Sequence, residues 1–171
     1  MKRQGKLTLM AVTMLGLLAI TAAPAWAQYG DIPPAPIPIP VDKLDLNGTW
    51  TFQTSEPTVT GDCPAGTALS GTAAITQEGM NVTLKYLTGP NCRPAAVCSY
   101  AGTLDEDNQF VVSNSVTVDG EGGKVTSEIH LTVFDNGLAK GTATNHYVHP
   151  KGFECQWKMF VSFMREDKDS Q

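Results

Sequence analysis

Hydrophobic and polar residues alternate along most of the chain beyond residue 46. Over residues 124–134, Val125, Ile129 and Leu131 share one set of alternate positions, while Lys124 and Glu128 belong to the other, polar set. Successive side chains of a β-strand point to opposite faces, so this pattern predicts a strand with one buried face. No segment beyond residue 46 has a helical period long enough to compete, which makes the chain all-β.

The same alternation predicts eight strands, at residues 48–55, 69–77, 81–88, 97–104, 109–118, 124–134, 138–148 and 154–165. Strands that follow one another through tight turns favour an antiparallel up-and-down barrel, because closure removes the exposed edges that an open meander leaves. A sandwich of two sheets is the alternative, since alternation alone does not show closure.

The connections between these strands differ in length at the two ends of the barrel. Short turns, "EGMN", "DEDN" and "FDNG", follow the second, fourth and sixth strands. Long connections, "EPTVTGDCPAGTA", "GPNCRPAA" and "HPKGF", follow the first, third and seventh strands. In an antiparallel meander the long connections share one end, which we expect to be the open mouth.

All four cysteines, Cys63, Cys92, Cys98 and Cys155, lie in or beside these long loops. An even number of cysteines predicts two disulfides that brace the mouth, provided that the chain folds in an oxidising compartment. Closure of the barrel favours a disulfide between Cys63 and Cys155, because the last strand then neighbours the first. The remaining cysteines, Cys92 and Cys98, would then form the second disulfide. The two crossed pairings stay open, since four cysteines allow three connectivities.

The first 27 residues have the pattern of a signal peptide. Lys2, Arg3 and Lys6 precede an apolar stretch, and "AWA" before Gln28 is a typical cleavage site. Cleavage leaves nine Lys and Arg against 17 Asp and Glu, a formal charge of −8. We therefore expect a periplasmic or secreted protein that avoids nucleic acid and anionic membrane surfaces.

Four regions follow along the chain: the signal peptide at 1–27, a Pro-rich arm at 28–45, the barrel at 46–166 and a polar tail at 167–171. The arm contains "DIPPAPIPIP", which favours an extended polyproline segment. It is interpreted as a stiff spacer, or alternatively as a docking peptide.

The strand phases place a set of mostly apolar side chains inside the barrel. An eight-stranded barrel is either just filled by such side chains or holds one small ligand. Small inward residues, such as Gly71, Ala73, Gly141 and Ala143, favour a cavity, with Asn145 facing it if its strand is phased through Ala143. The candidate ligand-binding residues are Phe52, Leu84, Tyr86, Phe110, Val112, Asn114, Ile129, Leu131, Trp157 and Met159.

The stretch "LNGTW", with Gly48 and Trp50, resembles the G-x-W signature at the start of the barrel in lipocalins and their calycin relatives. In those families an arginine near the end of the last strand packs over this tryptophan, and Arg165 ends the last predicted strand. The resemblance implies that these three residues form the closed base. The turn "FDNG" departs from the T-D-Y-like motif of many lipocalins, so the resemblance is to a distant relative.

Two functions remain open. The resemblance implies an exported barrel that binds a small, mostly apolar molecule in its interior. The alternative is a protein-interaction module with a filled core, since exported bacterial protease inhibitors also resemble small eight-stranded barrels. In that case the braced loops and the Pro-rich arm would contact an exported protein.

Other classes fit poorly. No G-x-S-x-G, H-E-x-x-H or phosphate-binding glycine loop is present, so neither an enzyme nor a cofactor is expected. His146 and His149 near Cys155 suggest a metal site, but Pro150 interrupts them and cysteines oxidise in this compartment. An outer-membrane barrel is excluded by outward polar residues such as Glu128, which would face lipid.

Overall fold

A computed structural model describes residues 43–61, 63–118, 120, 122–135 and 137–166. The predicted signal peptide, the Pro-rich arm up to residue 42 and the polar tail from residue 167 lie outside the described residues. No helix among the described residues is long and apolar enough to cross a membrane.

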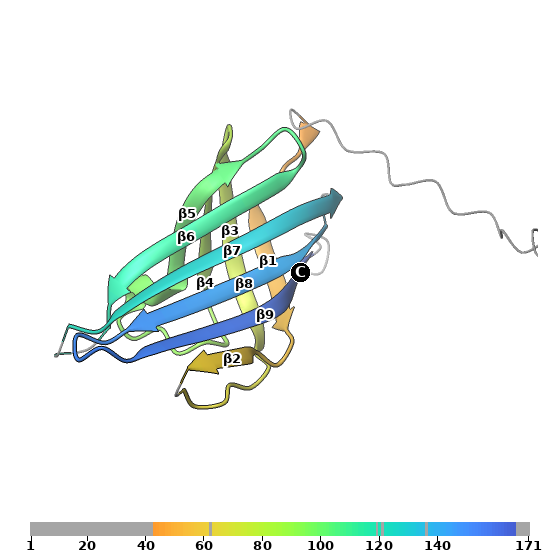
Figure 1. Ribbon diagram of the computed structural model, residues 1–171. Coiled ribbons are helices and arrows are strands. Elements are labelled where there is room, and N and C mark those ends of the chain that lie inside the picture. The colour runs from red at the N-terminus through yellow and green to blue at the C-terminus, as the bar shows by residue number, and fades with distance from the viewer. Residues whose placement is uncertain (1–42, 62, 119, 121, 136, 167–171) are drawn as a thin grey trace, which may run out of the picture. The chain divides into compact units, whose positions relative to one another are not determined.

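The described chain forms an all-β, antiparallel barrel (Figure 1). Each strand from β3 onward pairs with the next along the chain, and β1 pairs with both β3 and β9, which closes the barrel. The predicted eight-stranded antiparallel barrel is therefore confirmed. Its strands are β1 (Gly48–Thr54), β2 (Thr58–Gly61), β3 (Ser70–Glu78), β4 (Asn81–Tyr86), β5 (Ser99–Leu104), β6 (Gln109–Thr117), β7 (Lys124–Asp135), β8 (Leu138–Val148) and β9 (Glu154–Arg165).

The short strand β2 was not expected from the alternation. It pairs with β9 at Cys155–Lys158, while β1 pairs with the same strand from Val161 to Arg165. The two segments therefore continue each other along β9 and occupy one of the eight positions around the barrel. Pro57, which lacks a backbone donor, lies in the bend between them, and the run Thr58-Val59-Thr60 is too short to show an alternation.

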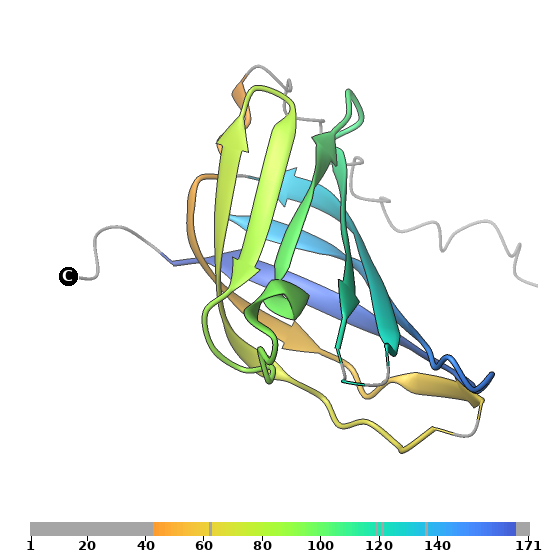
Figure 2. The same ribbon diagram turned by 90° about the vertical axis from the view of Figure 1, so that its left-hand side faces the viewer.

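The other difference lies before β5. The predicted strand begins at residue 97, whereas β5 begins at Ser99 and a short 3₁₀ helix, η2 (Ala95–Cys98), precedes it. The Cys92–Cys98 disulfide closes this connection into a small ring, so the backbone turns instead of extending. Figure 2 shows η2, β2 and the β8–β9 connection at one end of the barrel, and the first described residues at the other end.

The interior is tightly filled over the half of the barrel nearer the base. Trp50, Phe110 and Phe163 are fully buried there. Two residues before β1, Leu44 and Leu46, also belong to the core. Alternate residues of β6 and β7 are exposed, as expected for strands with one wet face.

Candidate ligand-binding site at the mouth of the barrel

Two disulfides brace the long connections. Cys63 pairs with Cys155 (S–S 2.18 Å), which joins the segment after β2 to the start of β9. Cys92 pairs with Cys98 (S–S 2.02 Å) within the β4–β5 connection. These are the pairings that barrel closure favours, and both lie at the end opposite to Trp50. The predicted disulfide-braced loops are confirmed.

Inside this end, uncharged polar side chains form one row across neighbouring strands. Asn114 of β6 lies opposite Ser127 of β7, and Ser127 lies opposite Asn145 of β8. Tyr100 of β5 extends the row, because the adjacent pair is Ala101 with Ser113. Cross-strand partners point to the same face of a sheet, so all four side chains belong to the inner face.

A cavity of about 80 Å³ opens beside this row. Rings form part of its wall: the centroids of Phe52 and Tyr86 lie 4.6 Å apart, and Tyr86 meets Tyr100 edge-on at 5.7 Å. The cavity is lined by Phe52, Thr54, Leu69, Tyr86, Pro90, Tyr100, Ile129, Ala143, Asn145 and Met159.

Some polar groups of the row form hydrogen bonds within the protein. The Asn114 amide nitrogen donates to the carbonyl oxygens of Ala96 (3.3 Å), Val97 (3.1 Å) and Ser99 (3.2 Å), which anchors η2 to β6. Burial raises the pKa of Tyr100, and hydrogen bonds with Ser127 and Asn114 partly offset the rise. Asn114 and Ser127 therefore support the wall of the cavity.

Two polar side chains that line the cavity have no such partner. Neither the Tyr86 hydroxyl nor the Asn145 side-chain amide hydrogen-bonds to any described residue. Burial raises the pKa of Tyr86 well above its usual value, with a further contribution from Tyr100. The Tyr86 phenol therefore keeps its proton at neutral pH and can donate as well as accept a hydrogen bond.

The ten predicted ligand-binding residues occupy three different environments. Phe52, Tyr86, Ile129 and Met159 line the cavity. Leu84, Phe110, Val112 and Leu131 are buried in the packed core, and none of them lines the cavity. Asn114 anchors η2, and the Trp157 indole donates to the carbonyl of Pro64 (3.1 Å), so that Trp157 packs the rim.

Several lining residues were missing from the predicted site. Tyr100 lies in "SYAGTL", where glycine and alanine leave the strand phase ambiguous, although its opposition to Asn114 could have been found from the register. Leu69 and Pro90 come from connections, whose approach to the mouth has no local signal. Asn145 faces the cavity together with Ala143, as the phase of its strand predicts.

At the opposite end, the three residues of the predicted base lie together. Trp50 is fully buried, pairs with Arg165 across β1 and β9, and donates its indole proton to the carbonyl of Leu46 (3.0 Å). Arg165 donates to the carbonyl of Asp45 (2.9 Å) and to its carboxylate (3.0 Å). Gly48 has a φ of +143°, and a Cβ there would lie 3.4 Å from the Arg165 guanidinium.

The base carries one strongly shifted carboxyl group. Hydrogen bonds from Arg165 and then from Asn47 lower the pKa of Asp45 to about 2. Asp45 is therefore ionised throughout the physiological pH range, and its ion pair with Arg165 ties the segment before β1 to the end of β9. This cluster lies at the end of the barrel opposite to the two disulfides, beside a hollow of about 620 Å³ that Asp45 and Asn47 help to line.

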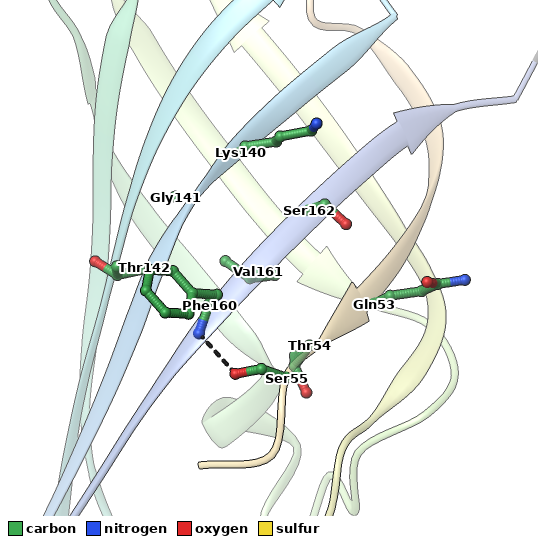
Figure 3. Close-up of a pocket in the computed structure, with 9 residues that line it drawn as sticks. All are labelled: Gln53, Thr54, Ser55, Lys140, Gly141, Thr142, Phe160, Val161 and Ser162. Carbon is green, nitrogen blue, oxygen red and sulfur yellow. Dashed lines mark hydrogen bonds between the residues drawn. The ribbon is translucent and has the colours of Figure 1, made fainter. Parts of the chain in front are cut away.

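Another hollow lies on the outer surface. A groove of about 510 Å³ runs over the place where β1 leaves β9, and it is lined by residues of β1, β8 and β9 (Figure 3). The Ser55 hydroxyl accepts a hydrogen bond from the Phe160 amide (3.1 Å), and the Phe160 carbonyl accepts one from the Ser55 amide (3.0 Å). Phe160, which lines the groove, is 72% exposed.

The histidines do not form a metal centre in the described part of the chain. His146 interacts with Glu154 (3.3 Å), and His149 stacks on Phe153 with ring centroids 5.0 Å apart. Cys155, the thiolate that such a centre would use, is in a disulfide. No group of three or more His, Cys, Asp or Glu residues able to hold a metal ion occurs among the described residues.

Comparison of the chain with protein-family models, curated proteins and solved structures finds no match.

Proposed function

We propose that this chain is an exported, lipocalin-like barrel that binds a small, mostly apolar molecule at its mouth. The observation that carries the proposal is the cavity beside Tyr86 and Asn145, two partially buried polar side chains without a protein partner. Polar side chains that face a hollow and form no hydrogen bond within the protein can bind a ligand or water there. The clustering of Gly48, Trp50 and Arg165 supports the lipocalin-like assignment.

The volume limits what can enter. The cavity of about 80 Å³ is far smaller than the 300 Å³ or more of a drug-sized pocket. A long lipid does not fit inside the packed core. The ligand therefore inserts one small ring or branched group, and the remainder of the molecule stays at the rim.

Export is supported by the two disulfides, because such bonds persist in oxidising compartments. The basic and apolar start of the chain, followed by "AWA", supports the same conclusion. Cleavage after Ala27 is part of the proposal, and the mass of the secreted protein tests it.

Native mass spectrometry of the secreted, unreduced protein tests the binding function. A small adduct that disappears on denaturation is expected. Ala143→Leu should abolish it, because Ala143 is 7% exposed and lines the cavity, which the larger side chain would fill. Ala101→Leu is the matched control, since Ala101 is exposed on β5. An adduct retained by Ala143→Leu would contradict binding at the mouth.

The alternative function is a periplasmic protein-interaction module or protease inhibitor. The filled core and the exposed Phe160 beside the outer groove favour it. Braced loops also lose less entropy on binding a partner. Inhibition assays against exported serine and metalloproteases test this function, using the mature chain and a variant lacking residues 28–40. Stoichiometric inhibition that depends on the arm would favour the alternative.

A further inference from the structure

The mouth cavity contains hydrogen-bonding groups but no charge. The ten residues that line it are all uncharged, and Asn145 and the hydroxyls of Thr54, Tyr86 and Tyr100 are its polar side chains. An ion entering the cavity would lose its hydration without gaining a counter-ion from the wall. The wall therefore discriminates against charged molecules of the same shape.

The four polar side chains are not equally available to a ligand. The Thr54 hydroxyl already accepts the amide proton of Leu69 (2.9 Å), and the Tyr100 hydroxyl interacts with Ser127 and Asn114. Tyr86 and Asn145 can still hydrogen-bond to a ligand, since no described residue hydrogen-bonds to the Tyr86 hydroxyl or the Asn145 amide. A phenol and a carboxamide can each donate and accept, so together they can recognise a hydroxyl, carbonyl or amide group.

The apolar part of the wall favours a flat group. Phe52, Tyr86 and Tyr100 form a continuous set of rings, with Phe52–Tyr86 centroids at 4.6 Å and an interplanar angle of 56°. Met159 also lines the cavity, and its flexible thioether adapts to an aromatic edge. Ile129 and Ala143 provide buried apolar surface beside these rings.

We infer that the ligand is an uncharged small molecule that inserts the edge of a ring bearing a hydroxyl, carbonyl or amide group, recognised by Tyr86 and Asn145. This inference rests on the proposed function and adds the chemical class of the ligand. The polar group of the ligand meets Tyr86 and Asn145, and its ring contacts Phe52 and Met159.

Four probes of similar size separate the contributions of charge and hydrogen bonding. Phenol and benzamide are neutral and polar, toluene is neutral and apolar, and benzoate is charged. Dissociation constants are measured by titrating the ¹⁵N-labelled, disulfide-intact mature protein in NMR. Phenol and benzamide are expected to bind about tenfold or more tightly than toluene, and benzoate more weakly still, because an unsatisfied or desolvated polar group weakens binding.

Two substitutions test the assigned residues. Tyr86→Phe removes only the hydroxyl, and Asn145→Leu replaces the amide by an apolar group of similar size. Each should reduce the phenol preference over toluene by about tenfold while toluene binding is retained. Asn81→Leu is the matched control for Asn145→Leu, because Asn81 is exposed on β4 and does not line the cavity, and it should leave all four constants unchanged. Circular dichroism checks that each variant folds.

The outcomes distinguish an error in the ligand class from an error in the proposed binding function. Toluene or benzoate binding as tightly as phenol would overturn the ligand class while leaving small-molecule binding at the mouth intact. A phenol preference that survives both substitutions would overturn the roles of Tyr86 and Asn145. Absence of binding by all four probes, together with the absence of a native adduct, would overturn the proposed function itself.

Discussion

Removing the Cys63–Cys155 disulfide should destabilise the barrel more than removing Cys92–Cys98. The first bond joins residues 92 apart and the second joins residues 6 apart. A cross-link limits the conformations of the unfolded chain, and this effect grows with the logarithm of the loop length. The loop lengths correspond to about 4 to 5 kcal/mol for Cys63–Cys155 and about 2 kcal/mol for Cys92–Cys98.

Two double variants each remove one disulfide: Cys63→Ala with Cys155→Ala, and Cys92→Ala with Cys98→Ala. Each serves as the control for the effect of the other on stability. Each pair contains one buried cysteine, since Cys155 is 2% exposed and Cys98 is 3% exposed. Lost packing should therefore be similar, which leaves loop length as the main difference. The loss of Cys63–Cys155 also frees β2, which pairs only with β9 among the described strands.

Urea unfolding of the unreduced proteins, monitored by tryptophan fluorescence, measures the loss of unfolding free energy in both variants. The Cys63 and Cys155 variant should also show a larger dependence of unfolding free energy on urea, because its unfolded chain exposes more surface. Hydrogen exchange should increase first at residues 58–61. An equal or larger loss of stability in the Cys92 and Cys98 variant would refute the reasoning from loop length.

Two further predictions concern the base and the sheet. The pKa of Asp45 is lowered to about 2 by Arg165 and Asn47, so its contribution is present above pH 4 and is lost as the pH falls towards 2. Asp45→Asn should therefore cost about 1 kcal/mol at pH 7 in urea unfolding, a value reduced because the carboxylate is half exposed. The cost should shrink towards zero as the pH falls through 2, and a pH-independent loss would contradict this. Gly102→Ala places a Cβ 1.7 Å from the Val111 carbonyl oxygen and should cost about 3 kcal/mol or more in thermal unfolding. Gly120→Ala, which has open space around its Cβ, is the control, and equal stability of the two variants would contradict the close approach.

The sequence by itself determined the features that depend on neighbouring residues. Alternation places the side chains of Phe52, Ile129 and Met159 on the inner face, because adjacent residues of a strand point to opposite sides. The positions of the four cysteines in long loops predicted a braced mouth. The resemblance of Gly48, Trp50 and Arg165 to the lipocalin pattern implied that these residues form the base.

Only the tertiary structure decided where the interior is filled and where it is hollow. Alternation cannot distinguish Leu84, which is fully buried in the core, from Tyr86, which lines the cavity two residues later. That difference depends on the cross-strand register, which aligns Asn114, Ser127 and Asn145, and on connections that bring Leu69 and Pro90 to the mouth. Register and closure are contacts between distant parts of the chain, so no local pattern encodes the cavity they leave.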